Sequence, residues 1–256
     1  MLPVTTSVAV VASAVIGQAT PAPAAGDVHA LLEAADADYA HRDEPGKLSD
    51  AQRKLDEAVK LAPEDYDVLW RLARLYFWES DDPKLSKDEQ SKLGMDAWDW
   101  GMKAVARDPN RVEGHYFAAV GIGNYSLGIG VLKALAKGIE GKFRSQLSAA
   151  EKIDPKYLDG GVYNAWGRFY YELPWPKYDA KKSEQNLRRA VEVNPADLRA
   201  RVYLADLYLK EGNPKEAKKL IDAVLASKPG KYDPPEEERS IELARMRLPE
   251  VEKALK

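Results

Sequence analysis

The segment YLADLYLKEGNPKEAKKLIDAVLASKP, residues 203–229, decides the fold of this chain. Its first half carries apolar and aromatic residues at helical spacing, and the sequence GNP at 212–214 then breaks the helix. A second helical pattern runs through Ile221 and Val224, and Pro229 stops it. The segment therefore predicts a hairpin of two helices that ends at a proline.

The end of this hairpin recurs along the chain. A small or β-branched apolar residue stands five positions before a proline in the pairs Ala58–Pro63, Ala104–Pro109, Ala150–Pro155, Ala190–Pro195 and Val224–Pro229. Successive prolines are 46, 46, 40 and 34 residues apart. The small residue lets two helices approach closely, and the proline ends the second helix before the next unit. A repeat of this kind predicts stacked hairpins, an architecture that usually binds partners rather than catalyses reactions.

The order of residue types over 203–229 resembles the tetratricopeptide repeat (TPR): a large residue, a small one, an aromatic, a turn glycine, an alanine, a bulky apolar residue, a small one and proline. The last proline interval, 34 residues, is the period of that repeat. The four earlier units match it in two halves with extra residues between them. The resemblance implies an all-α, TPR-like α-solenoid of about five helical hairpins with loop insertions.

Three regions are expected along the chain. Residues 1–25 carry no charge, contain the apolar run 8–16 and end in PAPAA, which predicts a signal peptide cleaved near residue 25, or else a disordered tail. The run is shorter than the roughly 20 residues that span a bilayer, which disfavours an uncleaved membrane anchor. The segment departs from a signal peptide in one respect, because no Lys or Arg precedes the apolar run. Residues 26–233 hold the repeats. Residues 234–256 suit a capping helix that Pro249 kinks or interrupts.

Two segments narrow the resemblance: DVLWRLARLY at 67–76 and WGRFYYELPWP at 166–176. They resemble irregular TPR proteins that include the T-component of TRAP-type transporters and the regulator of microtubule dynamics family. Proteins like the T-component are periplasmic, bind a solute-binding protein and present an apolar cleft thought to hold a small ligand. The resemblance thus implies a periplasmic or secreted location. The chain lacks the cysteine through which lipid-anchored members are attached, so the resemblance does not imply a lipid anchor.

Candidate binding residues follow from the first helix of each hairpin, because these helices line the concave face of a solenoid. Aromatic side chains with two arginines suit a ligand that has an apolar body and an anionic end. The alternative is that the aromatics are packing between helices and the arginines are surface side chains. The candidates are Trp70, Arg74, Phe77, Trp78, His115, Asn164, Arg168, Tyr171 and Asp206, with Arg199 in the same repeat as Asp206.

The insertion at 121–143 is rich in glycine and is followed by the cationic segment VLKALAK at 131–137. The glycines permit sharp turns, and the segment could form a lid, a docking element or a contact with a membrane surface. The structural alternative is a longer hairpin in which glycine allows close helix packing. The longer hairpin with close helix packing is favoured, because the basic run is short and Glu140 interrupts it.

Composition excludes several classes of function. The formal net charge is −3 and no basic stripe is present, so a nucleic-acid partner is not expected. With no cysteine and three scattered histidines, neither a cofactor nor a metal site is expected. No catalytic motif occurs, so the chain is expected not to be an enzyme.

The sequence thus predicts a non-enzymatic TPR scaffold of the cell envelope. It would engage a protein partner, such as a solute-binding or envelope protein, with a small apolar or anionic ligand in the concave cleft. A structural adaptor for an extended peptide or helix is one alternative, and a protein associated with a membrane surface through 121–143 is another. The sequence leaves the oligomeric state open.

Overall fold

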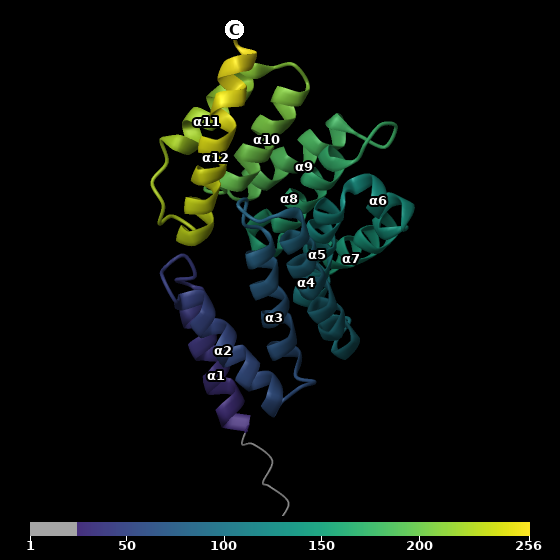
Figure 1. The fold of residues 1–256 in the computed structure, drawn as a ribbon, viewed down its shortest axis with the longest axis vertical. Coiled ribbons are helices and arrows are strands. Elements are labelled where there is room, and N and C mark those ends of the chain that lie inside the picture. Colours follow the sequence, from purple (N-terminus) through teal and green to yellow (C-terminus); the bar gives the residue numbers. More distant parts are fainter. Residues whose placement is uncertain (1–24) are drawn as a thin grey trace, which may run out of the picture.

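The computed structural model describes residues 25–256, so that all but the last residue of the predicted signal segment lies outside the described part. Over this range the chain forms twelve helices and no strand (Figure 1). The helices are α1 (Ala25–Tyr39), α2 (Lys47–Leu61), α3 (Tyr66–Ser80), α4 (Lys87–Arg107), α5 (Val112–Ile129), α6 (Val131–Ala136), α7 (Ile139–Ile153), α8 (Tyr157–Glu172), α9 (Ala180–Val193), α10 (Leu198–Lys210), α11 (Pro214–Leu225) and α12 (Pro234–Ala254).

The helices pair into five hairpins, as the sequence predicts. These are α1–α2, α3–α4, α5–α7, α8–α9 and α10–α11, each packing against the next, and α12 packs on the last one. The sequence places the extra residues of the first four hairpins in loops, but part of them lengthens helices instead: α4 has 21 residues and α5 has 18, and α5 contains the first part of the 121–143 insertion. The loop of the third hairpin holds α6. The all-α solenoid is therefore confirmed.

The recurring hairpin ends share one local structure. The second helices α2, α4, α7 and α9 each end two residues before the repeat proline, and the first residue after each helix donates its N–H to the carbonyl of the small residue. Ala58, Ala104, Ala150, Ala190 and Val224 are all completely buried. Their role as tight contacts between helices is confirmed.

The glycines of the 121–143 insertion act differently from one another. Gly121, Gly123 and Gly128 lie inside α5 and make no turn. Gly130 and Gly138 do turn the chain, with φ of 91° and 70°, one on each side of α6. These positive φ values favour glycine, which has no Cβ.

The glycines inside α5 are explained by its approach to α4. A Cβ on Gly121 would lie 2.6 Å from the backbone nitrogen of Trp98, and one on Gly128 would lie 2.5 Å from that of Ser91. On α4, a Cβ on Gly101 would lie 2.6 Å from the backbone nitrogen of Ala118. The two helices therefore touch along their backbones, a distance that only glycine permits. Close helix packing, the favoured interpretation of this segment, is what the structure shows.

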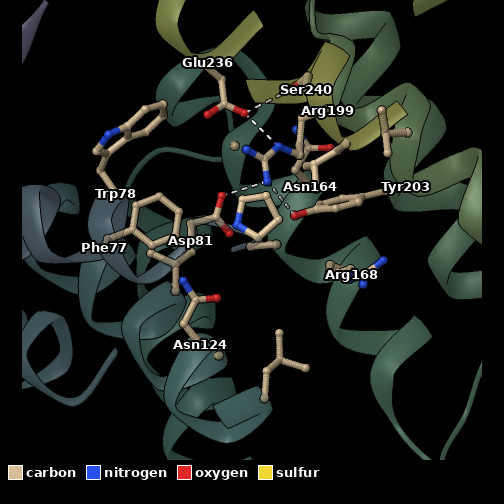
Figure 2. A pocket seen from close by; sticks show the side chains of 18 of the residues that line it. Phe77, Trp78, Asp81, Asn124, Asn164, Arg168, Arg199, Tyr203, Glu236 and Ser240 are labelled. Atoms are coloured by element: carbon tan, nitrogen blue, oxygen red, sulfur yellow. Dashed lines mark hydrogen bonds and ion pairs between the residues drawn. The ribbon is translucent and has the colours of Figure 1, made fainter. Parts of the chain in front are cut away.

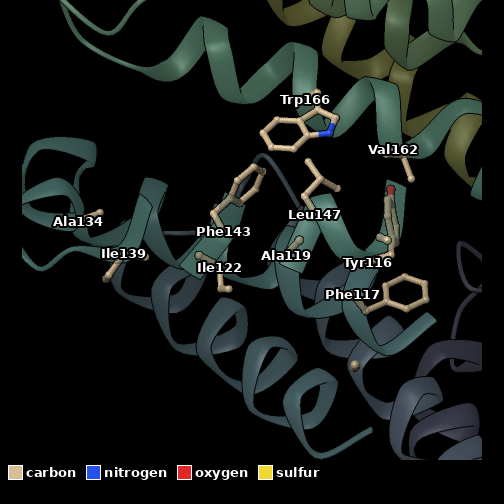
Figure 3. Close-up of a cluster of buried hydrophobic side chains, with 12 residues drawn as sticks. Tyr116, Phe117, Ala119, Ile122, Ala134, Ile139, Phe143, Leu147, Val162 and Trp166 are labelled. Atoms are coloured by element: carbon tan, nitrogen blue, oxygen red, sulfur yellow. The ribbon is translucent and has the colours of Figure 1, made fainter. Parts of the chain in front are cut away.

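The most extensive apolar core lies between the second, third and fourth hairpins. Figure 3 shows its aromatic and branched side chains converging from α5, α7 and α8. Phe143 stacks on Phe169 with ring centroids 4.6 Å apart, and Trp166 meets both rings edge to face. The tight α4–α5 pair thus presents one face of α5 to α7 and α8, and this face leads into the concave side of the solenoid.

The C-terminal helix is continuous through Pro249, which corrects the expectation of an interruption there. Pro249 removes one helical hydrogen bond, and the carbonyl that loses it belongs to the exposed residue Arg245, where water can replace the donor. None of the helices in the described range is long and apolar enough to cross a membrane.

We predict that Gly121→Ala destabilises the protein by about 1–3 kcal/mol, because the new methyl group would overlap the backbone of α4. The matched control is Gly123→Ala on the same helix, where a Cβ meets only Phe143 at 3.5 Å. The control should be neutral or stabilising by up to about 1 kcal/mol, since alanine favours helix. Urea denaturation measures both, and equal stabilities would contradict the packing described.

Candidate binding cavity

The concave side of the solenoid holds a partly open cavity of about 910 Å³. Its wall comes mainly from the first helices α3, α5, α8 and α10 and from the N-terminal half of α12 (Figure 2). One side of the wall is apolar and continues the core of the third and fourth hairpins. The apolar side chains are Phe77, Phe117, Val120, Leu127, Val131, Phe143, Phe169 and Leu173.

The opposite side of the cavity is held together by Arg199 of α10. Its Nη1 donates to Asp81, directly after α3, and its Nε donates to Glu236 of α12, both at 2.8 Å (Figure 2). The residue is 8% exposed, and its Nη2 has no hydrogen-bond partner within the described part of the chain. Burial disfavours the charged guanidinium, but Asp81 and Glu236 outweigh it and raise the pKa of Arg199 above its ordinary value. One buried cation therefore joins the second hairpin to the fifth and to α12.

A second contact closes the superhelix around Trp78 of α3. Two guanidinium groups lie over the indole, that of Arg42 of the first hairpin at 4.1 Å from the ring centroid and that of Arg239 of α12 at 3.3 Å. Arg42 also binds Asp233 at 2.5 Å, and Arg239 donates to the carbonyl of Trp78 at 2.6 Å. The N-terminal hairpins are thus tied to the C-terminal helix, and the solenoid closes into a ring.

The structure brings six of the nine predicted site residues to the cavity wall. These are Arg74, Phe77, Trp78, Asn164, Arg168 and Asp206, and Arg199 joins them. The other three have different surroundings. Trp70 stacks on Phe117 and donates to Asp67, and His115 bonds to Gln146 and to the carbonyl of Pro109. Tyr171 lies against the guanidinium of Arg168, away from the wall.

The two arginines proposed to meet an anionic ligand are already bound by carboxylates of the chain. Arg74 binds Asp36 at 2.5 Å, and Arg168 binds Asp206 at 2.8 Å and Glu172 at 2.6 Å. Asp206 also accepts from Arg247 of α12 at 2.8 Å. An anionic ligand would therefore have to compete with these internal partners.

Carboxylates outnumber cations in the cavity wall. Asp36, Asp81, Asp82, Glu140, Glu172, Asp197, Asp206, Asp233, Glu236 and Glu237 face Arg42, Arg74, Lys87, Arg168, Arg199 and Arg247. Burial opposes the charge of Asp36, but hydrogen bonds and charge from Arg71 and Arg74 outweigh it and lower its pKa. Burial raises the pKa of Asp197 and of Glu236. The wall is thus neutral to acidic, and its cations are mostly compensated from within.

The sequence missed the residues that close the cavity. Arg42 lies in the loop between α1 and α2, Asp233 in the loop before α12, and Glu236 in α12, all outside the first helices from which the candidates were chosen. Their contacts join residues up to 191 positions apart, and the repeat pattern carries no signal for such a contact. In the described residues, no group of His, Asp and Glu side chains is placed to hold a metal ion.

A sequence profile of the regulator of microtubule dynamics protein 1-3 family matches residues 31–175, which is more than half of the chain. The chain belongs to this family. A tetratricopeptide-repeat profile matches residues 178–235, which cover the helices α9 to α11. Together the two matches confirm that this is an irregular TPR protein resembling the regulator of microtubule dynamics family. A comparison with curated proteins gives no match.

Solved TPR structures share the fold of this family member. The thermophilic TPR protein TTC0263 of Thermus thermophilus superposes with a TM-score of 0.64 at 22% identity, covering 86% of this chain and 99% of that protein. PilF of Pseudomonas aeruginosa gives a TM-score of 0.50 at 17% identity, covering 88% of this chain and 92% of that one. At these identities the likeness shows the helical repeat fold alone.

We predict that Arg199→Ala destabilises the protein by about 3–5 kcal/mol, because Asp81 and Glu236 would stay partly buried without their cation. Arg201→Ala is the matched control on the same helix, since its guanidinium makes one exposed hydrogen bond to the carbonyl of Pro195. That change should remain within about 0.5 kcal/mol of wild type. Denaturant unfolding of both variants checks this, and an Arg199→Ala variant as stable as Arg201→Ala would show that the ring is held elsewhere.

Proposed function

We propose that this chain is a non-enzymatic binding module that takes an apolar ligand, or an apolar group of a partner protein, into the cavity of its closed solenoid. The observation that carries the proposal is the apolar wall formed by α3, α5, α7 and α8 around a volume of about 910 Å³. Cavities of roughly 300–1,000 Å³ with mainly apolar walls are typical of sites for small molecules.

The fold supports the general part of this proposal. TPR proteins are generally scaffolds that bind other proteins, and the stacked hairpins provide the concave surface that such proteins use. The ring closure favours a ligand carrier over an adaptor for an extended peptide, because α12 bridges the two ends of the concave face instead of leaving a continuous open groove. The internal pairing of Arg74 and Arg168 favours an apolar group over an anionic one.

The proposal includes a partner protein. A solute-binding or envelope protein is the partner that the resemblance to the transporter T-component suggests. The convex face and the rim of the cavity are available to such a partner, while the cavity itself holds the small ligand.

A neutral apolar dye tests the cavity directly. N-phenyl-1-naphthylamine should bind wild-type protein with a rise in fluorescence, and Val120→Trp should weaken this binding at least about tenfold by filling the apolar side of the cavity. Leu255→Trp adds the same indole at a position that is 41% exposed near the C-terminus and should bind the dye as wild type does. Equal dye binding by all three proteins, with circular dichroism unchanged, would overturn the proposal.

Export to the cell envelope is the second part of the proposal. The uncharged segment 1–25, with its apolar run at 8–16 and the small residues before position 26, supports it. Location in the periplasm would give the module access to envelope proteins and to solutes entering the cell.

Expression of the full chain in a Gram-negative bacterium tests export. We predict that the osmotic-shock fraction contains a protein whose intact mass lacks residues 1–25. A Val11→Arg variant, which places a charge in the middle of the apolar run, should accumulate uncleaved inside the cell. Full-length wild-type protein found only in the cytoplasm would contradict export and would leave the cavity proposal standing.

A further inference from the structure

One corner of the molecule combines exposed apolar side chains with a group of lysines. Leu132 of α6 is 72% exposed, and Trp175 of the loop between α8 and α9 is 87% exposed. They are the two most exposed of the large apolar side chains in the described part of the chain. The exposed cations around them are Lys133, Lys137, Lys142, Lys177, Lys181 and Lys182.

Two sets of contacts bring these segments together. Lys177, in the loop that carries Trp175, pairs with Glu140 in the first turn of α7, which begins three residues after α6 has ended. The ring of Tyr170 in α8 lies beside Arg144 of α7 at 5.6 Å and Lys182 of α9 at 5.3 Å. The start of α7 and the α8–α9 loop are therefore neighbours, and α6 packs against α7. We call this surface, residues 131–145 with 173–182, the basic corner.

The basic corner is cationic although the whole chain is acidic. Its two carboxylates are both engaged internally: Glu140 by Arg144 and Lys177, and Asp179 by Lys182 and the first turn of α9. In the described part of the chain, Lys133, Lys137 and Lys181 form no ion pair with a carboxylate. The formal charge of the chain is −3, so this concentration of free lysines is local.

We propose that the basic corner docks the protein on an anionic lipid surface, with Trp175 and Leu132 inserted at the headgroup level. Tryptophan prefers the interface between water and lipid, where its apolar ring and polar N–H are both accommodated. Lysines near an anionic bilayer surface attract it electrostatically. The α6 helix has six residues and cannot anchor the protein by itself, so the lysines and both apolar side chains act together.

The segments of the basic corner also contribute Val131, Phe143 and Leu173 to the cavity wall, but Leu132, Trp175 and the lysines of the corner do not line the cavity. Figure 1 shows α6 at the margin of the molecule opposite α11 and α12, the elements of the C-terminal end. Docking through the basic corner would leave α12 and the ring closure facing away from the lipid. A failure of lipid docking and a failure of ligand binding in the cavity are therefore distinguishable by different variants.

The test uses the full chain and vesicles of phosphatidylcholine with or without about 30% phosphatidylserine, on the order of the anionic lipid in charged leaflets. Wild type should sediment with the anionic vesicles at low salt and lose this binding as salt rises. The variant Lys133→Glu/Lys137→Glu/Lys181→Glu should bind at least about a hundredfold more weakly, because three attractive charges become repulsive. Within the described part of the chain none of the three lysines makes an ion pair, so the fold should be unaffected.

The matched control is Lys215→Glu/Lys228→Glu/Lys253→Glu, which changes the net charge equally on exposed lysines of the C-terminal elements. It should bind the anionic vesicles almost as wild type does. The uncharged N-terminal segment is present in every protein compared, so any contribution that it makes to lipid binding is the same throughout.

A fluorescent label supplies a second readout, because the chain has no cysteine of its own. Ala136→Cys on α6 and Ala223→Cys on α11 are both exposed helical positions for an environment-sensitive dye such as NBD. Anionic vesicles should shift the emission of the label at position 136 to the blue and leave that at 223 unchanged.

Three results would overturn the proposal. The first is equal vesicle binding by the two triple variants, and the second is a label at 136 that does not respond while the protein is bound. The third is absence of vesicle binding together with lysine-dependent binding of a polyglutamate peptide, which would assign the basic corner to an acidic protein instead of a lipid surface.

Discussion

Arg199 joins three distant parts of the chain, and the shape of the cavity depends on this contact. Its guanidinium contacts Asp81 at the end of the second hairpin's first helix and Glu236 in the C-terminal helix. A buried ion pair adds little net stability compared with apolar packing, but separating its members inside the protein is expensive, about 3–5 kcal/mol. The pairing therefore acts mainly by excluding other arrangements of the two ends. Together with the contacts of Trp78 with Arg42 and Arg239, it ties the two ends of the superhelix into a ring.

The ring can close only because the hairpins in between are tightly stacked. Backbone contact between α4 and α5 requires glycine at Gly101, Gly121 and Gly128, and the small residues before each repeat proline allow similar approaches elsewhere. The same face of α5 that this contact leaves free forms the apolar side of the cavity. The contact between α4 and α5 consequently determines both the packing of the repeats and the shape of the cavity. A change in the separation of these helices would alter both.

Local patterns in the sequence predicted much of the fold. The five small residues that precede the repeat prolines predicted the number of hairpins and where each one ends. Both a tight helix contact and a helix stop are decided by residues close together in the sequence. The glycines of α5 were harder, since glycine permits both a turn and a close helix contact, and only the position of α4 decides between them. Six of nine candidate residues reach the cavity, because helical periodicity places them on one face. The partners of Arg74, Arg168 and Arg199 could not be predicted, since most of them lie in another repeat or in α12.

The closed ring is the central claim, and the distance between its two ends tests it most directly. Because the chain has no cysteine, spin labels at Asp43→Cys and Lys231→Cys, both exposed and next to the Arg42–Asp233 contact, can be attached selectively. Double electron–electron resonance should give one short and narrow distance distribution in solution. A broad distribution centred at long distances would show an open superhelix, and would contradict the closed cavity.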